Sequence, residues 1–418
     1  MNTVSLAKDP FIRKDEGGGG GVTINNQEKS VDITENGVTE VTADSGFTGL
    51  SKVVVNTNVQ SGGGGGSDMP VIGDGKTYLY ITIAAEGRMD VPLYFRQSVA
   101  NGVTIDWGDG SAPETLSGTG NKNTTHKYAA IGDYVISLDP VDGCTLGLGR
   151  NTNSYSIMGS TQMQKRYNCS KLRMVEIGNN VTSIGDYTFD YCSALTSVVI
   201  PNGVTSIDEG AFRGCSALTS VVIPNSVTSI GSYAFGYCYA LASVIVPNGV
   251  TSIGEYAFAE CKALVSVVLS NSVTSIGRCA FRNCVSLAKM TIPNSVTSIG
   301  EYMLYNCTAL VSLTILDGVT SIGNSAFDSC SSLTSVVIPN SVTNISSSAF
   351  NNCLGVGFYD FSNHSVVATV SSNAFKGLAS DCKIIVPDAL YDEWIAATNW
   401  STYASNIIKK SDWDASQS

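Results

Sequence analysis

Apolar and polar positions alternate in a fixed 23-residue pattern through the second half of the chain. Within one copy, Leu-x-x-Val-x-Ile predicts a strand, Pro-Asn and Gly mark corners, and Ala-Phe predicts a short helical or 3-10 turn. The apolar positions of that copy are Leu195, Val198, Ile200, Val204, Ile207, Phe212 and Cys215. The tetrapeptide Val-Thr-Ser/Asn-Ile recurs every 23 residues, at Val181, Val204, Val227, Val250, Val273, Val296, Val319 and Val342. Because no step contains an insertion, the pattern predicts a stacked solenoid in which each coil places the same atoms against its neighbour.

Cysteines follow the same step. Nine of the twelve lie on it, at Cys169, Cys192, Cys215, Cys238, Cys261, Cys284, Cys307, Cys330 and Cys353. The other three are Cys144, Cys279 and Cys382. Stacking would bring neighbouring cysteines within disulfide distance, but their side chains should all point the same way into the core, and nine is an odd number. We therefore expect buried thiols that act as small apolar groups, not disulfides or a metal ladder.

A single coil cannot fold alone, because its buried apolar area falls short of the entropy lost by 23 ordered residues. Stacking supplies the missing contacts and yields a rigid rod with a repeated face. After Cys353 the period slips, since residues 370–375 repeat residues 345–350 with a step of 25. The last segment predicts an amphipathic helix that covers the open end of the core. Its apolar side is formed by Leu390, Trp394, Ala397 and Trp400.

Two glycine runs, Gly17–Gly21 and Gly62–Gly66, divide the N-terminal part, and we expect them to be flexible spacers. Neither is followed by the Lys-Ser/Thr of a phosphate-binding loop. The β-rich segment between them has fewer than 40 residues. It buries little surface and needs a partner or self-association. Beyond the second run, Val103, Ile105 and Trp107 alternate into a tight turn, as strands of a β-sandwich do.

The repeat resembles the leucine-rich repeats of the BspA-like surface proteins. Their pattern, L-x-x-V-x-I-P-x-x-V-x-x-I-x-x-x-A-F-x-x-C, is matched almost letter for letter from about residue 169 to residue 353. The resemblance implies a curved solenoid used for adhesion to cells, matrix or other surfaces. This chain departs from the pattern at Ser270 and Leu316, which replace the corner proline, and at Met303 and Leu304, which replace Ala-Phe.

Two shorter motifs carry further resemblances. Trp107–Gly110 reads Trp-Gly-Asp-Gly, and His126–Tyr134 reads His-Lys-Tyr and then Gly-Asp-Tyr. Together they resemble the β-sandwich of the polycystic-kidney-disease (PKD) type, which implies a spacer or carbohydrate-side module. We expect Asp106 and Asp109 to cap the turn, because their spacing lacks the further oxygen ligands of a calcium site. Residues 33–55 are similar to a segment of bacteriophage tail-associated and other virion proteins, which implies anchoring to a particle through residues 1–60.

The predicted fold class is therefore mainly β, a leucine-rich-repeat solenoid of 23-residue coils preceded by a small β module and a PKD-like or immunoglobulin-like β-sandwich. The predicted parts are an anchoring tail (1–16), a Gly linker (17–21), the small β module (22–60), a second Gly linker (61–67), the sandwich (68–150), the repeats (151–380) and a C-terminal cap (381–418).

Charge narrows the range of partners. Only 14% of residues are charged and the net charge is −11, so no nucleic-acid partner is expected. The one basic stretch, Gln164–Arg173, fits a charged and solvated first coil. No run of 18 apolar residues occurs, which argues against membrane insertion, and the first 21 residues contain no apolar region of a signal peptide.

Residues that carry chemistry are sparse. The chain has two histidines, His126 and His364, and neither lies in a zinc-ligand spacing, a Cys-His pairing or a Gly-x-Ser-x-Gly motif. Both are expected to be satisfied turn residues. We therefore expect no enzymatic activity, no cofactor and no metal site.

Two surfaces are candidate binding sites. With Val198 and Ile200 inward, strand alternation predicts an outward column on the expected concave face, here called the outer stripe. Its members are Val199, Val222, Ile245, Val268, Thr291, Thr314 and Val337. It is flanked by Ser197, Ser220, Ser243, Ser266, Lys289, Ser312 and Ser335. An uncharged stripe over seven coils points to a binding face, although β-branched residues could serve strand propensity alone.

The second candidate is a tyrosine-rich edge, here called the tyrosine edge. It consists of Tyr187, Tyr191, Tyr233, Tyr237, Tyr256 and Tyr302, with Tyr239 and Tyr305 beside them. Tyrosine offers an apolar ring with a hydrogen-bonding tip, which suits sugars and proteins. The alternative is that these rings fill corners of the coils.

These features predict a non-enzymatic adhesion or recognition protein whose partner is a host cell-surface protein or glycan. An adhesin pattern without an export signal, together with the phage-like segment, favours a bacteriophage virion protein, in a fibre, in a tail or attached to the capsid. The alternative is a bacterial cell-surface BspA-like adhesin, and a third reading is an enzyme or inhibitor scaffold. Association into a homo-oligomer stays open.

Overall fold

The structure, a computed structural model, describes residues 74, 76–85, 89–149, 157–158 and 168–418, together with five short N-terminal strands. The chain separates into two units, Met1–Asp74 and Gly75–Ser418. The strands of the first unit are β1 (Thr3–Val4), β2 (Val22–Thr23), β3 (Val31–Ile33), β4 (Val41–Thr42) and β5 (Val55–Thr57). Strand β4 pairs with β1 and β2, and β3 pairs with β5. The rest of the predicted tail, linkers and small module lies outside the described residues.

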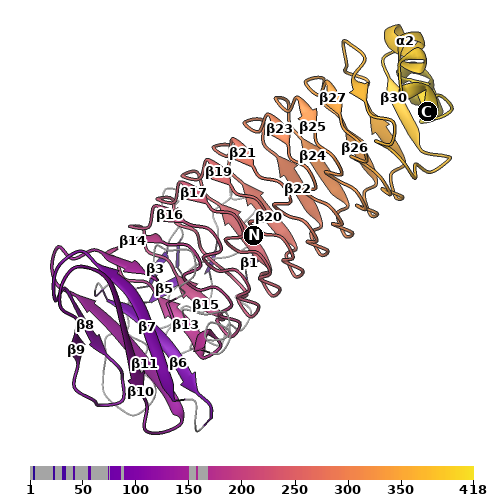
Figure 1. The fold of residues 1–418 in the computed structure, drawn as a ribbon. Helices are drawn as coiled ribbons and strands as arrows, with labels where there is room; N and C mark the ends of the chain where they lie inside the picture. The colour runs from indigo at the N-terminus through magenta and orange to yellow at the C-terminus, as the bar shows by residue number, and fades with distance from the viewer. Residues whose placement is uncertain are drawn as a thin grey trace. The chain divides into compact units, whose positions relative to one another are not determined.

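The second unit begins with two sheets that face each other across an apolar core (Figure 1). Their strands are β6 (Thr77–Ile83), β7 (Asp90–Gln97), β8 (Val103–Asp106), β9 (Glu114–Thr115), β10 (Gly120–Lys127), β11 (Gly132–Pro140) and β12 (Leu146–Leu148). One sheet has the order β6-β11-β8-β9 and the other β10-β7-β12. Alternate residues of β6 are buried, as a strand with one face in a core requires. Leu79, Phe95 and Trp107 are among the core residues.

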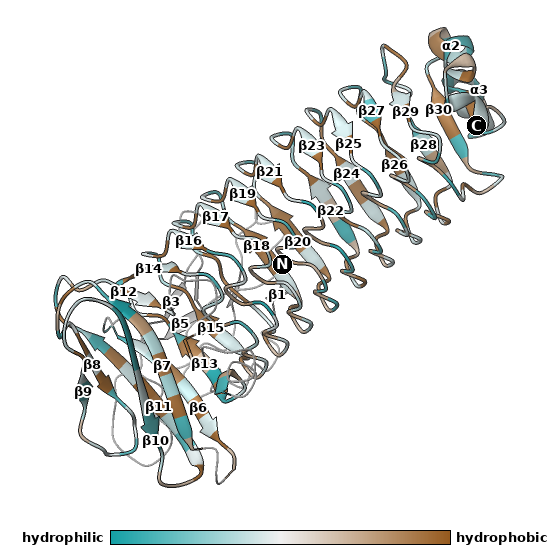
Figure 2. Ribbon diagram, viewed as in Figure 1, coloured by the Kyte–Doolittle hydropathy of each residue, from teal (hydrophilic) through white to brown (hydrophobic). Residues whose placement is uncertain are grey.

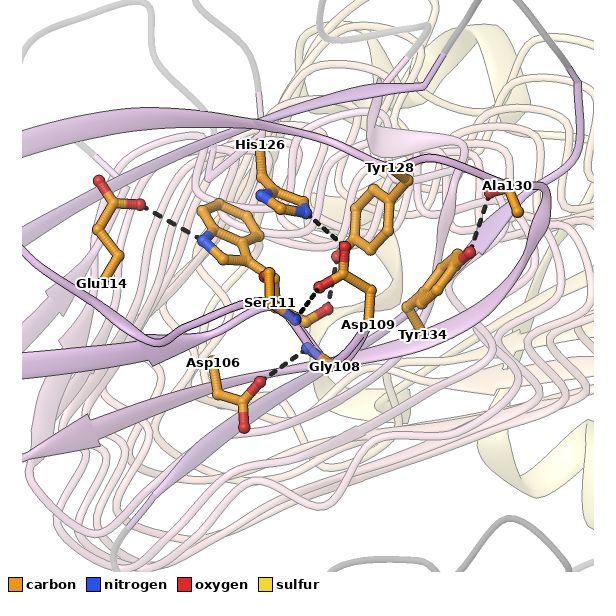
Figure 3. A network of polar contacts seen from close by, with 10 residues as sticks. Asp106, Gly108, Asp109, Ser111, Glu114, His126, Tyr128, Ala130 and Tyr134 are labelled. Carbon is orange, nitrogen blue, oxygen red and sulfur yellow. Dashed lines mark hydrogen bonds and ion pairs between the residues drawn. The ribbon is translucent and has the colours of Figure 1, made fainter.

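The turn after β8 is held by side chains (Figure 3). Asp106 accepts a hydrogen bond from the Gly108 amide at 2.9 Å, and Asp109 accepts one from the Ser111 amide at 3.0 Å. His126 Nε2 lies 2.7 Å from Asp109, and its ring stacks on Trp107. The two aspartates therefore cap the turn, as their spacing predicts. The resemblance to the PKD-type module as such stays a prediction.

Both sheets continue into the repeats. Strand β13 (Leu172–Glu176) pairs antiparallel with β6 and parallel with β15 (Ser197–Val199). In the other sheet, β12 pairs antiparallel with β7 and parallel with β14 (Val181–Ile184). Main-chain hydrogen bonds thus join the sandwich to the first coil on both faces. The predicted boundary at residue 150 lies close to this seam.

Each coil of the solenoid contributes to two rows of parallel strands (Figure 1). The first row, which carries the outer stripe, continues from β13 and β15 with β18 (Ser243–Val246), β20 (Ser266–Leu269), β22 (Lys289–Ile292), β24 (Ser312–Ile315), β26 (Ser335–Val337), β28 (Phe358–Asp360) and β30 (Lys383–Val386). The second, here called the Val-Thr row, continues from β14 with β16 (Ser206–Ile207), β17 (Ser229–Ile230), β19 (Ser252–Ile253), β21 (Ser275–Ile276), β23 (Ser298–Ile299), β25 (Ser321–Ile322), β27 (Asn344–Ile345) and β29 (Thr369–Val370).

The strand register equals the sequence repeat. Ser243 pairs with Ser266 and Ile245 pairs with Val268, each 23 residues apart. Toward the end of the array Asn344 pairs with Thr369, a step of 25. The structure therefore confirms a mainly β solenoid of 23-residue coils, with the predicted slip near its end.

A stack of side chains fills the solenoid. The rings of Phe212, Phe235 and Phe258 stack with centroids 5.2 and 5.4 Å apart, and their planes differ by 6° or less. All twelve cysteines are free and buried, which confirms the expectation of buried thiols. They are more than apolar fillers, because the Cys238 thiol donates a hydrogen bond to the Phe212 carbonyl at 3.2 Å. The same contact recurs from Cys215 to Cys353.

Between residues 185 and 377, the Ala-Phe side of each coil is a series of hydrogen-bonded turns and contains neither an α-helix nor a 3-10 helix. The predicted helical or 3-10 conformation is therefore wrong. In one coil, the amides of Tyr233, Phe235 and Tyr237 donate to carbonyls of the next coil at 2.8 Å, while the amides between them bond within the coil. Tyr233 and Tyr237 have positive φ. This alternation turns every second amide toward the neighbouring coil, whereas a helix would keep them all within one coil.

The C-terminal residues cover the last coil. The elements are η1 (Asp388–Leu390), α2 (Tyr391–Ala396), η2 (Trp400–Tyr403), β31 (Ile407–Lys409) and α3 (Lys410–Ser416). Trp400 donates a hydrogen bond to the Ala368 carbonyl at 2.6 Å, and Asn399 donates one to the Val370 carbonyl at 2.8 Å. These bonds satisfy the free edge of β29. Strand β31 extends the other sheet beyond β30.

The predicted cap is therefore present, but its single helix is not. Ala397 is extended and Asn399 has a φ of 67°, which separates α2 from η2. The break lets Trp394 and Trp400 both reach the core, where each is fully buried. In the part of the chain that the structure describes, no helix is long and apolar enough to cross a membrane.

Candidate recognition surfaces

Strand alternation places the outer stripe on the surface. In β18 the pattern is half-buried, buried, exposed and buried from Ser243 to Val246. The apolar members of the stripe are 37% to 52% exposed, and both threonines are exposed. The inward neighbours Val198 and Ile200 are buried, as expected. All seven predicted side chains therefore lie outward in one row, six of them on strands and Val222 in the coil that joins the row through the isolated bridge of Ser220 with Ser243.

A third outward column lies beside the serine column, on the side away from the stripe, and sequence reasoning missed it. Val265 and Val311 are 52% and 47% exposed, and each directly follows the buried Leu of its coil. The signal is the spacing Leu-x-x-Val, which leaves two residues between inward positions where strict alternation would leave one. The apolar surface is thus wider than predicted around Ile245 and Val268. In Figure 2 the ribbons of β18 and β20 are largely coloured as hydrophobic, because their inward and outward residues are both apolar.

Charge is nearly absent from this face. Between Ser197 and Val337, Lys289 is the single charged residue in the stripe and its serine column. Charged side chains gather instead beside the Ala-Phe turns, among them Arg213, Glu260 and Arg278. The charged residues of most coils therefore lie at the edge formed by the Ala-Phe turns, while the outer stripe and the Val-Thr row are both nearly uncharged.

Both ends of the stripe are bounded. At the N-terminal end Glu176, which pairs with Val199, is buried. At the C-terminal end the ring of Trp413, from α3, lies 5.2 Å from the ring of Phe358, which follows Ser335 in register. The open stretch of the stripe runs from Val199 to Val337.

The tyrosine edge has a backbone conformation that the sequence did not predict. All six candidate tyrosines have φ between 53° and 63°, in the left-handed region that non-glycine residues rarely adopt. Glycine takes the equivalent places in the second coil, at Gly210 and Gly214. A Cβ at Gly210 would collide with the ring of Tyr187. These tyrosines therefore stand at corners where the chain must turn toward the next coil.

The rings of this edge are engaged with their neighbours. Arg213 lies over both Tyr187 and Tyr191, at 4.9 and 5.3 Å from the ring centroids, and forms an ion pair with buried Asp190. Burial, and then a hydrogen bond to Glu209, raises the pKa of Tyr187 to about 12.

The same bracing continues along the edge. Tyr233 and Tyr256 stack at 4.6 Å, and Arg278 lies over Tyr302. Tyr237 is exposed and the other five candidates are half-buried. This pattern favours the corner-filling interpretation for most of the edge.

His364 and the basic stretch, which are the other candidate residues, have structural roles. His364 is buried between the carbonyls of Phe361 and Val342, and burial lowers its pKa. Of the basic stretch, Lys171 is buried and donates to the Asp90 carbonyl at 2.8 Å, and Arg173 donates to Thr82 at 3.2 Å. Among the described residues, no group of three or more His, Cys, Asp or Glu could hold a metal ion.

Comparison with known proteins identifies the repeats. Residues 163–269 and 251–382 match the model of the BspA type leucine rich repeat region, in six copies. No curated protein matches the chain.

Among solved structures, a leucine rich repeat protein of T. pallidum is 30% identical, with 42% of this chain and 86% of that chain covered and a TM-score of 0.38. A leucine rich cell surface protein of Faecalibacterium prausnitzii is 32% identical, with 50% and 64% covered and a TM-score of 0.34. A leucine-rich repeat protein of Bacteroides ovatus is 22% identical, with 60% and 86% covered and a TM-score of 0.30. Because the family match spans more than half of the 418 residues, this chain belongs to the BspA-type leucine-rich repeat family.

Proposed function

We propose that the protein is a non-enzymatic recognition protein that attaches to a surface through the outer stripe and the columns beside it. The observation that carries the proposal is the row of exposed, uncharged side chains from Val199 to Val337. A folded protein seldom leaves so regular an apolar row in water unless the row has a partner. Strand propensity alone also favours β-branched residues, but the exposed threonines of the Val-Thr row satisfy it without placing aliphatic groups in water.

Family membership supports the same proposal, since the resemblance to BspA-like proteins implies adhesion. It fits a bacterial cell-surface protein, the alternative reading, better than a virion protein. The virion reading has no support among the comparisons. The anchoring role of residues 1–60 stays a prediction, because most of them lie outside the described residues. A host cell-surface protein or glycan is the partner proposed for this face.

The binding test uses two matched variants of the full chain. Ile245→Glu with Val268→Glu places two charges on the outer stripe of neighbouring coils. Thr251→Glu with Thr274→Glu places the same charges on the exposed Val-Thr row, beside the same coils. All four side chains are exposed, but the Val-Thr pair also loses the hydrogen bonds that the Thr251 and Thr274 hydroxyls donate to the preceding coil. Circular dichroism and thermal unfolding therefore check that both variants stay folded.

We expect the stripe variant to lose adhesion to cultured epithelial cells and to arrays of matrix proteins and glycans, while the Val-Thr variant keeps it. Equal adhesion by both variants would place the binding surface elsewhere on the molecule. Location is tested separately, by protease treatment of intact source cells and by mass spectrometry of purified phage particles.

A further inference from the structure

Resting on the proposed function, we propose that the outer stripe takes an uncharged linear polysaccharide of extended, β-1,4-linked hexoses, laid along the array so that successive sugars meet successive coils. The columns beside the stripe take part in the contact. The proposal follows from three properties of this face: its charge, its spacing and the chemistry of each coil.

Charge selects against most polymers. The chain carries 35 acidic residues, yet none lies in the stripe or its serine column between Ser197 and Val337. A polyanion such as nucleic acid or a glycosaminoglycan would need a row of cations, and Lys289 alone cannot supply it. A polycation would bind carboxylates beside the Ala-Phe turns, such as Glu260, and not this face. An uncharged ligand has no charged group to remove from water when it binds, so this face need not supply a compensating charge.

Spacing selects among uncharged polymers. Neighbouring strands of a sheet lie about 4.8 Å apart, and the pairs Ser243 with Ser266 and Ile245 with Val268 show no drift of register from coil to coil. An extended β-1,4-linked hexose chain advances by a slightly greater length per sugar, and successive rings are turned over, so that alternate sugars present the same face to alternate coils. An extended peptide advances by about 3.4 Å per residue and falls out of step within a few coils. A proline-rich helix is recognised in aromatic-lined grooves, and the stripe contains no aromatic residue.

Five of the seven coils offer the same pair of contacts, a serine and a branched aliphatic residue, whereas Lys289 with Thr291 and Ser312 with Thr314 replace it in the other two. In β20, Ser266 and Val268 are two residues apart and project from the same side of the strand. The serine hydroxyl can donate to or accept from a sugar hydroxyl, and the branched aliphatic group can lie against the C–H face of the ring. One such pair is weak. Five along the array act together, because each bound sugar holds the next one close to its coil.

The proposal makes the affinity depend on ligand length. The probes are cellobiose, cellotetraose and cellohexaose, titrated into the full chain by calorimetry. We expect the affinity to rise at least tenfold from the disaccharide to the hexasaccharide and to change less than twofold between 0.05 and 0.5 M NaCl. Ile245→Glu with Val268→Glu should lower hexasaccharide affinity more than tenfold, and Thr251→Glu with Thr274→Glu should leave it unchanged.

Hyaluronan and fibronectin serve as an anionic and a protein probe. Binding that does not grow with oligosaccharide length would overturn the polysaccharide proposal. So would salt-sensitive binding of hyaluronan, or binding of fibronectin alone. If the stripe variant still loses cell adhesion in those cases, the proposed function stands without the polysaccharide. If the stripe variant keeps both adhesion and sugar binding, both proposals fail.

Discussion

At the residue scale, the nine cysteines at the 23-residue step, here called the cysteine ladder, combine apolar packing with hydrogen bonding. The seven thiols from Cys215 to Cys353 each fill a small space and also donate to a carbonyl of the neighbouring coil, as Cys284 does to Phe258 at 3.2 Å. Burial raises the pKa of Cys261 and of Cys307 to about 12, so these sulfurs stay protonated near neutral pH. The thiolate, which is the reactive form, is therefore almost absent at these two positions.

Thiol reagents should consequently label none of the twelve cysteines while the chain is folded, and all twelve once it is unfolded in guanidinium chloride. The measurement is the absorbance of a dithionitrobenzoate reaction at pH 8, with and without denaturant. Rapid labelling of several thiols under native conditions would show that the ladder is open to solvent. A disulfide between ladder positions would appear as missing thiols in the unfolded sample.

The stacked phenylalanines give a second prediction at this scale. Phe235 lies between Phe212 and Phe258 in the middle of the array and is fully buried. Phe235→Ala removes the ring contacts and leaves a cavity, and should cost about 3–5 kcal/mol in the free energy of unfolding. Urea unfolding followed by circular dichroism measures the loss. An unchanged midpoint would contradict the register of the core.

The turn of the sandwich supplies a pH dependence. Hydrogen bonds from Ser111, and then from His126, lower the pKa of Asp109 to about 2, below its ordinary value of 3.8. A group with a lowered folded-state pKa stabilises the fold above its unfolded pKa and loses that contribution as pH falls through the folded value. Unfolding free energy should therefore drop between pH 4 and pH 2, and Asp109→Asn should flatten this part of the profile. Equal profiles for the two proteins would remove Asp109 from the explanation.

At the element scale, the sequence predicted strands and register better than turns. The 23-residue step predicts which residues stack, because seven successive steps contain no insertion, and the one step of 25, from Asn344 to Thr369, comes near the end of the array. The tyrosine corners could not be predicted, because Tyr233 and Tyr237 occupy a left-handed conformation that their residue type disfavours. The conformation is explained by the backbone amides of these residues, which it turns toward the next coil to form hydrogen bonds there. In the cap, the sequence predicted more regular structure than is present. The spacing of Trp394 and Trp400 suits one helix, but the chain breaks at Asn399.

The candidate surfaces show the same limit. Alternation within a strand correctly placed the outer stripe, since only burial had to be inferred. It could not show that Arg213 covers Tyr187 and Tyr191, because that contact joins neighbouring coils through side chains of no fixed pattern. It also could not show that the side chain of Val265 is exposed. The inward positions there, Leu264 and Val267, are three residues apart, whereas strict alternation would place them two apart.

The seam between sandwich and solenoid is an element-scale feature with a measurable effect. Leu79 of β6 is buried and pairs with Val175 of β13 as well as with Ile136 of β11. Leu79→Ala should cost about 2–5 kcal/mol and should speed hydrogen exchange in β13 and β15 as well as in the sandwich. A sandwich that acts as a separate spacer would leave the exchange of β15 unchanged. Mass spectrometry of peptic fragments distinguishes the two results.

At the scale of the whole molecule, both ends of the solenoid are closed. The sandwich continues both sheets at one end, and the C-terminal residues cover them at the other. Deleting residues 387–418 would expose the edges of β29 and β30 and the core around Phe375. We expect the shortened chain to aggregate at micromolar concentration. Light scattering checks this, and a stable monomer would show that the cap is dispensable.

The unbroken 23-residue step also bears on how such a protein can change over generations. Because neighbouring coils are joined by the same kind of backbone bonds at the same step, duplication or loss of one whole unit keeps the strand pairing between the remaining coils. Misaligned recombination between near-identical stretches of the gene would thus yield longer or shorter molecules that still fold. The reach of the protein, and the number of times it grips its target, can vary in whole steps without a new design for the fold.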